Sequence, residues 1–300
     1  MGPIMSKIEM YLITFSFYNN STMGYKIISK TELSENLYEI KVYAPYVVKN
    51  ATAGQFIILR VDEEGERVPL TIADIDKEKN ELTMVFMAVG YSTKKLAILN
   101  AGEEIQDLAG PLGIPTEIKN YGTVVCVAGG YGAAPAYLIA KAFKEAGNKV
   151  YMIVGARTAQ LVFWQDRMKS ASDKYFITTD DGSLGRKGFV THQLDELINT
   201  EKIDHVMAIG PVPMMKAVAE LTRDKGIYTV VSMNTLMVDG TGMCGSCRLT
   251  VDGKVKFACV DGPDFDAHKV DFDEVIRRTS AYKDHEKRFD EHCKLSSFIK

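Results

Sequence analysis

The 300-residue sequence lacks the features that mark two large classes of protein. It has no excess of positive charge, because 36 Lys and Arg are set against 39 Asp and Glu, for a net charge of −3. It also has no basic patch interleaved with aromatic residues, so we expect no nucleic-acid partner. No stretch approaches the roughly eighteen apolar residues of a membrane span, so we expect no membrane partner either.

Cysteine is scarce, and its distribution is uneven. The five cysteines are an odd number, and three of them fall between residues 239 and 259. This is not the pattern of a secreted disulfide framework, so it indicates a reducing compartment and predicts a cytoplasmic protein. Cys126 lies in an apolar stretch and is interpreted as a packing residue, because a buried free cysteine behaves as a small hydrophobe. Cys293 is interpreted as incidental.

The three clustered cysteines have a spacing typical of iron–sulfur proteins. Asp239, Cys244, Cys247 and Cys259 follow the pattern Asp-x4-Cys-x2-Cys-x11-Cys. Plant-type [2Fe–2S] sites use Cys-x4-Cys-x2-Cys and a distant fourth cysteine, so an aspartate stands here at the first position. Interleaved glycines let such a loop fold back so that its thiolates converge. The spacing therefore favours a [2Fe–2S] cluster.

Structural zinc is the alternative interpretation of these cysteines. Zinc sites usually pair two Cys-x2-Cys knuckles or add two histidines at knuckle spacing, and this sequence has neither. Between Cys247 and Cys259 an alternating segment carries an Asp252-Gly253 turn, which predicts a β-hairpin that makes the two cysteines neighbours. For Asp239 two roles stay open, as a cluster ligand or as a cap of the turn.

Residues 24–120 have the pattern of short β-strands. Stretches rich in β-branched and aromatic residues alternate with turn signals, which predicts a small antiparallel barrel. The segment from Arg67 to Thr71 combines a cation, a proline-stiffened strand and a hydroxyl. The segment Gly90-Tyr91-Ser92-Thr93 opens a predicted helix with Ser92 or Thr93 as its cap, and the N–H groups at such a terminus form an anion site. The predicted strands are 26–30, 37–44, 55–62 and 81–89.

Strands and helices alternate in the middle third of the sequence. An apolar strand at 123–128 is followed at once by the glycine-rich turn from Gly129 to Pro135, a helix, and a second strand at 149–155. This βαβ unit places phosphates at the N-terminus of its helix. Gly130 and Gly132 match the dinucleotide fingerprint, but Pro135 replaces its third glycine. Further strands at 176–179, 206–210 and 228–233 end in loops of the kind that bind ligands in open α/β sheets.

The order of these regions resembles that of the ferredoxin-NADP reductase-like flavoproteins, over residues 24 to about 273. The segments 129–135, 180–185 and 259–263 are similar to one branch of that superfamily. The branch holds the electron-transfer subunit of dihydroorotate dehydrogenase and the small subunit of NADH-dependent reduced ferredoxin:NADP oxidoreductase. The first type uses four cysteines for its cluster, and the second uses one aspartate and three cysteines. The segment from Met237 to Cys244 resembles the second type more.

The resemblance implies a multi-domain β and α/β fold with three cofactors, FAD, NAD(H) and a [2Fe–2S] cluster. The implied parts are an N-terminal extension (1–23), an FAD-binding antiparallel β-barrel (24–120), an open parallel α/β NAD(P)-binding domain (121–231), and a [2Fe–2S] loop domain with a C-terminal tail (232–300). The implied FAD residues are Arg67, Pro69, Leu70, Thr71, Gly90, Ser92 and Thr93. The implied nucleotide residues are Gly130, Gly132, Ala133, Pro135, Arg157, Asp180, Gly210, Pro211 and Met214. The implied cluster ligands are Asp239, Cys244, Cys247 and Cys259.

The activity that the resemblance implies is that of an oxidoreductase subunit. A hydride passes between nicotinamide and flavin, single electrons pass between flavin and cluster, and a large flavin and iron–sulfur subunit is the partner in an electron-bifurcating heterodimer, with ferredoxin as an indirect partner. No catalytic acid or base is required, because the cofactors carry the chemistry. The alternatives are a dihydroorotate dehydrogenase electron-transfer subunit or a sulfide- or sulfur-linked reductase subunit, and a redox sensor without turnover.

Two finer expectations concern the nucleotide and the tail. The resemblance favours NADH over NADPH, although Arg157 stands where an arginine meets a 2′-phosphate in related sheets. The segment from Phe272 to Lys300 is strongly charged and has a helical pattern, which suits either a solvated surface or a docking tail.

Overall fold

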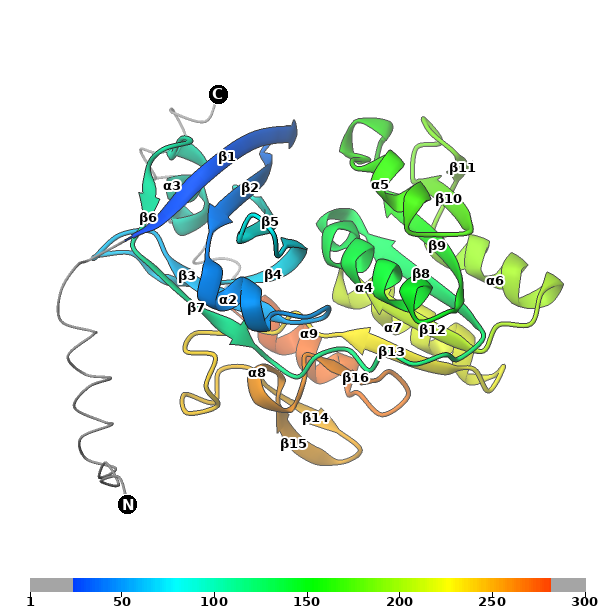
Figure 1. Cartoon of the computed structure of the whole chain (residues 1–300). Helices are drawn as coiled ribbons and strands as arrows, with labels where there is room; N and C mark the ends of the chain where they lie inside the picture. The colour runs from blue at the N-terminus through cyan, green and yellow to red at the C-terminus, as the bar shows by residue number, and fades with distance from the viewer. Residues whose placement is uncertain (1–23, 282–300) are drawn as a thin grey trace, which may run out of the picture.

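The computed structural model describes residues 24–281, in which three parts follow one another along the chain (Figure 1). A β-rich part comes first, an α/β part second, and a small part with a two-stranded hairpin last. The expected N-terminal extension and most of the charged tail, including Cys293, lie outside the described residues. Between residues 24 and 281, no helix is long and apolar enough to cross a bilayer.

The first part is a seven-stranded antiparallel sheet that curls into a nearly closed barrel, as predicted. The strand order is β6-β1-β2-β5-β4-β3-β7. Its two edge strands are separated in sequence by Gln106 alone, so the sheet has to curve until its edges meet. The elements are β1 Tyr25–Ser34, β2 Leu37–Tyr43, α2 Pro45–Asn50, β3 Phe56–Arg60, β4 Arg67–Asp76, β5 Glu81–Met87, α3 Tyr91–Ile98, β6 Glu104–Ile105 and β7 Asp107–Leu112.

The second part is an open sheet of order β11-β10-β9-β8-β12-β13-β16, which confirms the predicted parallel α/β domain. Its strands are parallel except β16, Asp264–Asp266, which runs antiparallel to β13. The elements up to β13 are β8 Thr123–Gly129, η1 Gly130–Gly132, α4 Ala133–Glu145, β9 Lys149–Ala156, η2 Ala159–Leu161, α5 Gln165–Ser170, β10 Lys174–Thr179, β11 Arg186–Lys187, α6 Val190–Thr200, β12 His205–Ile209, α7 Val212–Arg223 and β13 Tyr228–Ser232.

The two faces of strand β8 belong to two different hydrophobic cores. Cys126, with Val124 and Ala128, packs into the core that includes the barrel and α4, so its predicted packing role is confirmed. Val125 and Val127 point the other way, into the core formed with α6, α7 and the cysteine segment. Successive side chains of a strand face opposite sides, so this one strand joins all three parts of the molecule.

The third part holds the predicted hairpin. Strands β14, Arg248–Val251, and β15, Lys254–Phe257, pair antiparallel. Asp252 and Gly253 both have positive φ, 52° and 69°, as a two-residue hairpin turn requires. Helix α8, Ala258–Asp261, and strand β16 follow, and helix α9, Phe272–Ser280, confirms the helix expected at the start of the charged tail. Because β16 pairs with β13, the third part adds one strand to the sheet of the second part, while its hairpin forms a separate sheet.

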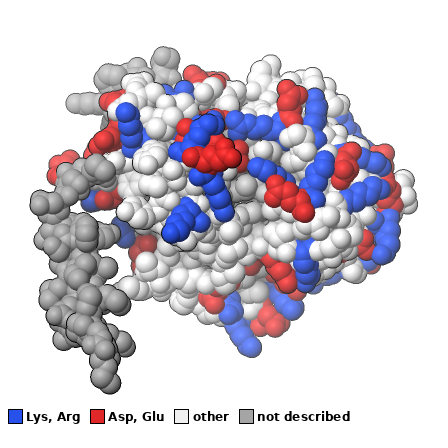
Figure 2. All heavy atoms as spheres, in the orientation of Figure 1, with Lys and Arg blue, Asp and Glu red and all other residues white. Residues whose placement is uncertain are grey.

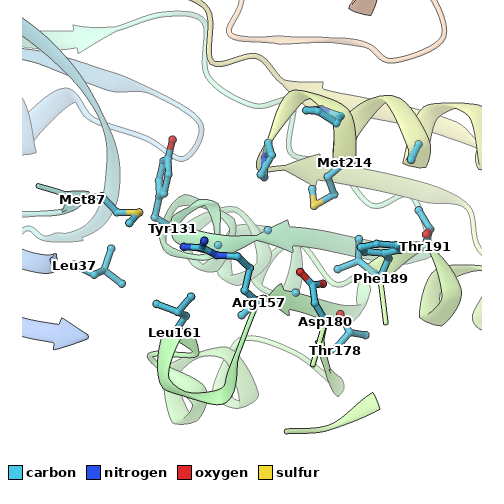
Figure 3. Close-up of a pocket in the computed structure, with 18 of the residues that line it drawn as sticks. Leu37, Met87, Tyr131, Arg157, Leu161, Thr178, Asp180, Phe189, Thr191 and Met214 are labelled. Carbon is cyan, nitrogen blue, oxygen red and sulfur yellow. The ribbon is translucent and has the colours of Figure 1, made fainter. Parts of the chain in front are cut away.

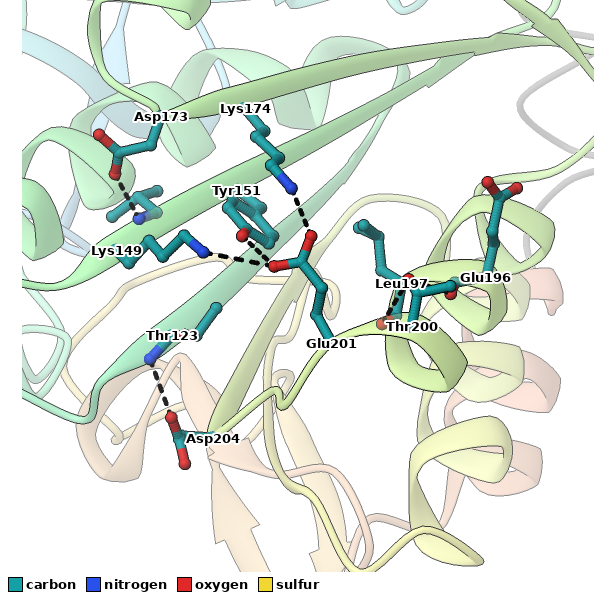
Figure 4. A network of polar contacts seen from close by, with 11 residues as sticks. Thr123, Lys149, Tyr151, Asp173, Lys174, Glu196, Leu197, Thr200, Glu201 and Asp204 are labelled. Atoms are coloured by element: carbon teal, nitrogen blue, oxygen red, sulfur yellow. Dashed lines mark hydrogen bonds and ion pairs between the residues drawn. The ribbon is translucent and has the colours of Figure 1, made fainter.

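A polar network holds together the amino ends of the parallel strands (Figure 4). Glu201, just after α6, accepts hydrogen bonds from Tyr151, Lys174 and Lys149. The hydrogen bonds from Lys174 and Tyr151 lower the pKa of Glu201 to about 2. The face seen in Figure 2 shows acidic and basic side chains intermingled over this second part. The network lies at the amino ends of the strands. Open α/β sheets bind their ligands at the opposite, carboxyl ends.

Candidate functional site

A cavity of about 530 Å³ lies at the carboxyl ends of the parallel strands. Its walls come from the ends of β8, β9 and β10, from the turn after β12 and helix α7, and from the barrel strands β2 and β5 (Figure 3). Open α/β sheets bind their ligands at this edge. Five of the nine nucleotide residues implied by the sequence line the cavity: Gly130, Arg157, Asp180, Pro211 and Met214.

The other four implied nucleotide residues lie behind the cavity wall rather than in it. A β-carbon on Gly132 would stand 2.7 Å from the Ile209 carbonyl oxygen, and one on Gly210 would stand 2.8 Å from Met214 Cε. These glycines therefore let the turns after β8 and β12 pack against each other. Ala133 and Pro135 are buried in the first turn of α4. Their contribution is to shape the turn and to aim the helix N-terminus.

Sequence reasoning missed the remaining walls of the cavity. Thr178 lies two residues before Asp180, within the last two residues of β10. Including the last residues of the strand as candidates, and not only the loop after it, would have identified it. Leu37 and Met87 come from the barrel, and no local pattern connects them with the nucleotide domain. Gly129 and Tyr131, which also line the cavity, belong to the glycine-rich turn predicted from the sequence; the other missed lining residues are Ser34, Gly155, Ala156, Leu161, Phe189, Val190, Thr191, Pro213 and Ala217.

Arg157 is the basic side chain at this cavity. It is exposed, and it forms no ion pair with another residue between 24 and 281. Figure 3 shows it projecting into the cavity beside Asp180. Its guanidinium is therefore available to an anionic group, while the Asp180 carboxylate would oppose one placed close to it. The two side chains give opposite preferences for a phosphate at this position.

The residues implied for FAD lie on one strand and on the helix terminus beside it. Pro69, Leu70 and Thr71 are half-buried on β4, and Arg67 at its start is exposed. Gly90 is the N-cap of α3, and the Thr93 hydroxyl accepts the Gly90 N–H at 3.0 Å. The helix predicted after Gly90 is confirmed, but the predicted cap is wrong: Gly90 itself is the N-cap, because the helix begins one residue after it, and Thr93 reaches back from the first turn.

Ser92 connects these two groups of residues. Its buried hydroxyl donates a hydrogen bond of 2.8 Å to a carboxylate oxygen of Glu66, the residue before Arg67. The start of β4 and the N-terminus of α3 are thereby held together. The two groups of implied flavin residues, about 20 positions apart in the sequence, therefore lie close to each other.

The cysteine loop brings its sulfur atoms together as the hairpin predicted. The Sγ atoms of Cys247 and Cys259 are 3.2 Å apart, and both residues are buried, while Cys244 is exposed. The described cysteines, these three and Cys126, are all free thiols. The loop's glycines at 240, 242 and 245 all have positive φ, which other residues adopt with strain.

Asp239 lies beside Cys244 on the other side of the loop. Its two carboxylate oxygens accept the backbone N–H groups of Thr241 at 2.7 Å and of Cys244 at 2.8 Å. The Thr241 N–H, followed by the contacts with Cys244, holds the pKa of Asp239 below its ordinary value. These are the contacts of a turn cap, so the ligand role of Asp239 stays a prediction.

The donor set suits a binuclear cluster better than a single metal ion. Among residues 24–281, no three Cys, His, Asp or Glu side chains converge on one point as zinc ligands do. The loop instead offers two neighbouring pairs, Cys247 with Cys259 and Asp239 with Cys244. A [2Fe–2S] cluster takes two protein ligands at each iron, so the residues present fit this group.

Family models match two parts of the chain. One, the oxidoreductase NAD-binding domain, covers residues 126–220. The other, the iron–sulfur cluster binding domain of dihydroorotate dehydrogenase B, covers residues 234–271. The chain is 46% identical over 262 residues to the dihydroorotate dehydrogenase B (NAD(+)) electron transfer subunit homolog of Thermotoga maritima, a match that spans 87% of this chain and 93% of that protein. It is 35% identical over 253 residues to the electron transfer subunit itself from Bacillus pumilus, across 81% of this chain and 96% of that protein.

The chain belongs to the dihydroorotate dehydrogenase B electron transfer subunit family. Its fold matches, with a TM-score of 0.85 and 44% identity, a chain of the NADH-dependent reduced ferredoxin-NADP oxidoreductase that was solved to study flavin-based electron bifurcation. That match covers 91% of this chain and 99% of the solved one. As a member of this family of oxidoreductases, the chain uses FAD, a [2Fe–2S] cluster and NAD(H).

Proposed function

We propose that this chain is the electron-transfer subunit of a two-subunit oxidoreductase. It passes electrons between NAD(H), FAD and a [2Fe–2S] cluster, and from the cluster to a large flavin and iron–sulfur subunit. When bound, FAD exchanges a hydride with the nicotinamide and single electrons with the cluster. The protein's part is to position the three groups in series, since this chemistry requires no acid or base from the chain.

The observation that carries this proposal is the contact between the cysteine loop and the barrel. A β-carbon on Gly240 would stand 2.7 Å from Ile58 Cδ1. Ile58 lies on β3 directly opposite Pro69 of β4, one of the residues that we assign to the flavin. The cluster loop is therefore one strand away from the proposed flavin surface. Such proximity is what direct electron transfer between the two groups requires.

The proposed binding surfaces follow from the positions of the residues in the fold. Pro69, Leu70 and Thr71 support the flavin ring and ribityl chain on β4, with Arg67 at the rim. Gly90, Ser92 and Thr93 present the N-terminus of α3 to the pyrophosphate, because helix N-termini attract anions. In the nucleotide cavity, the turn after β8 supports the dinucleotide phosphates, and the turn after β12 flanks the nicotinamide. The cavity residues in these roles are Gly130, Gly132, Ala133, Pro135, Arg157, Asp180, Gly210, Pro211 and Met214.

The surface around the cluster loop suits a protein partner. Met243 is 88% exposed, and Leu236, Val238 and Val260 are also exposed apolar residues. A β-carbon on Gly242 would touch Val260 at 3.0 Å, so Met243 lies close to it. Apolar side chains gathered on a surface favour protein association. An electron that reaches the cluster has an exit through this face.

Three related enzymes are candidates for the complex to which this chain belongs. The aspartate at position 239 favours the ferredoxin-NADP oxidoreductase type over the four-cysteine dihydroorotate dehydrogenase type. A sulfide- or sulfur-linked reductase subunit shares the same chain of cofactors. A redox sensor without turnover is the candidate of a different class. We place the chain in the cytoplasm, an inference supported by its four described cysteines, all of them free thiols.

The test of the proposed function is an absorption spectrum of the purified chain with iron and flavin counts. We expect one FAD and two irons per chain and a yellow-brown spectrum that bleaches on addition of NADH. Addition of the partner subunit should then speed reduction of the physiological acceptor. Bleaching without acceleration by any partner would contradict the subunit claim, and flavin and iron that NADH does not bleach would support the sensor.

A further inference from the structure

A cluster of three side chains joins the barrel to the nucleotide domain beside the nucleotide cavity. The indole Nε1 of Trp164 donates a hydrogen bond of 2.8 Å to a carboxylate oxygen of Glu39. The Arg167 guanidinium stacks on the indole ring, 4.1 Å from its centroid, and lies 3.5 Å from the same Glu39 oxygen. Glu39 comes from barrel strand β2, and the other two come from η2–α5 of the nucleotide domain. We call these three residues the interdomain clasp.

Within the clasp, Glu39 is buried and Trp164 is conformationally constrained. The Glu39 side chain is only 10% exposed, although it carries a charge. Trp164 has left-handed backbone angles, φ 53° and ψ 29°, which bulky residues rarely adopt unless their surroundings hold them. The ring also packs edge-on against Tyr137 of α4 at 5.7 Å. A buried charge paired by a hydrogen bond and a cation is sensitive to the removal of either partner.

A second carboxylate lies at the edge of the clasp. Arg167 Nη1 is buried without a hydrogen bond, and its nearest acid is Asp74 of β4 at 3.9 Å. Arg167 thus lies between two barrel strands, β2 and β4, and the nucleotide domain. Its position depends on both sides of the domain boundary at once.

The clasp joins the two segments that contribute Leu37 and Leu161 to the nucleotide cavity. Leu37 lines the cavity and precedes Glu39 by two residues on β2, so both side chains are on one face of that strand. Leu161 lines the cavity from the nucleotide domain and precedes Trp164 by three residues. Figure 3 shows Leu37 and Leu161 at the same end of the cavity. The contact between Glu39 and Trp164 therefore holds together the two segments that carry these lining residues.

We infer that Glu39, Trp164 and Arg167 are positioning residues for the nicotinamide nucleotide, which act by fixing the width of its cavity between the two domains. This inference rests on the proposed function, because it takes NAD(H) as the occupant of the cavity. None of the three touches the cavity itself. They act through Leu37 and Leu161, so their loss weakens nucleotide binding while the residues assigned to the flavin are unchanged.

The test uses the full-length chain loaded with FAD and cluster. Glu39→Leu removes the hydrogen-bond acceptor, Glu39→Gln keeps an acceptor but removes the charge, and Trp164→Phe removes the donor. We expect Glu39→Leu to raise the KM for NADH about tenfold, the effect of losing a hydrogen bond to a charged group, with kcat changed less than about twofold. Glu39→Gln should restore part of the affinity. The double variant Glu39→Leu/Trp164→Phe should be no worse than the poorer single variant, because the pair acts as a unit.

Trp164 is the only tryptophan in the sequence, so its fluorescence reports on the clasp alone. We expect Glu39→Leu to shift the emission of the chain, and NAD+ titration to change the emission of the wild type more than that of the variant. Tyr151→Phe is the matched control, since it removes one hydrogen bond from an aromatic side chain to a glutamate at the amino ends of the parallel strands, at the opposite end of the strands from the cavity. FAD content confirms that each variant is folded.

Three outcomes separate the hypotheses. If NADH bleaches the wild type and the KM for NADH is unchanged in Glu39→Leu, the positioning role of the clasp is refuted and the proposed function still holds. An equal rise in KM in Tyr151→Phe also overturns the clasp, because it means that any loss of packing in the sheet has the same effect. A wild type that neither binds nor reacts with NAD(H) overturns the proposed function, and the inference falls with it.

Discussion

The carboxylate of Asp239 accepts a hydrogen bond of 2.8 Å from the backbone N–H of Cys244, so the first and second positions of the cysteine motif are in contact. The other oxygen accepts the N–H of Thr241 at 2.7 Å. A carboxylate in these contacts is oriented into the loop and stays ionised, which is the state in which it can bind iron. Its ordering role and its proposed ligand role are therefore compatible.

The first prediction separates these two roles of Asp239. Asp239→Cys should retain the cluster and change its reduction potential and electron paramagnetic resonance signal, because a thiolate donates more charge to iron than a carboxylate does. Asp239→Ala should lose iron. Asp76→Ala is the matched control, since Asp76 also accepts two backbone N–H groups, in a turn of the barrel. Full iron content and an unchanged spectrum in Asp239→Ala would mean that Asp239 only caps the turn.

The second prediction concerns the contact between the cluster loop and the barrel. Gly240 has φ 75°, and a β-carbon there would press on Ile58 and Leu112, so Gly240→Ala should move the loop away from the barrel. Gly253→Ala has the same strain at φ 69° with no atom within 4 Å of the new carbon. Both should lose about 1–2 kcal/mol of stability, measured by denaturant unfolding. Only Gly240→Ala should slow the reduction of the cluster by NADH, followed by stopped-flow absorbance. Equal rates in the two variants would refute the assigned contact.

The third prediction is a preference for NADH over NADPH, measured as kcat/KM with an artificial acceptor. The carboxylate of Asp180, beside Arg157, repels a 2′-phosphate, whereas the guanidinium of Arg157 attracts one. Arg157→Ala should lower the residual activity with NADPH about tenfold or more, the effect of losing a charge-assisted hydrogen bond, and leave that with NADH nearly unchanged. Arg186→Ala, which breaks a surface ion pair with Glu196, is the control. A higher kcat/KM for NADPH in the wild type would reverse the assignment.

The fourth prediction is a pair of opposed pH effects from two buried groups. Burial raises the pKa of Asp264 to about 6 and lowers that of His205 to about 4. The Asp264 effect follows from a folded pKa above the unfolded one: the stability it contributes is present below about pH 4 and is lost as the pH rises through 6. For His205 the folded pKa is the lower one, so stability is lost as the pH falls from about 6.5 to 4. The two effects are about 3 kcal/mol each and nearly cancel between pH 4 and 6.

Single variants expose these opposed slopes. Asp264→Asn keeps an acceptor for the Thr116 hydroxyl, which now donates to Asp264 at 2.6 Å, and should make stability rise more steeply with pH than in the wild type. His205→Phe keeps a ring that can stack on Tyr121, 4.3 Å away between centroids, and should make stability fall with pH relative to the wild type. Unfolding free energies at pH 4, 6 and 8 measure both. Parallel pH profiles in the wild type and Asp264→Asn would show that this carboxyl does not titrate in the window.

The sequence by itself determined the features that depend on short spacings. The hairpin between Cys247 and Cys259 follows from the Asp252-Gly253 turn, whose positive φ values few other residue pairs accept. The glycine-rich turn after β8 follows from Gly130 and its neighbours. These signals are local, since a turn or a helix terminus is fixed by the residues that form it. For the same reason the ligand set of the cluster loop could be proposed before the fold was known.

Only the tertiary structure decided which distant segments meet. Leu37 and Met87 of the barrel complete the nucleotide cavity, and Glu39 finds Trp164 across the domain boundary, yet none of these pairings leaves a periodic trace in the sequence. The three-residue strand β16 is too short for an alternating pattern, and only its pairing with β13 defines it. Contacts over long sequence separations depend on how whole sheets and helices pack, because each buried side chain selects its partner by shape and polarity rather than by its neighbours in the chain.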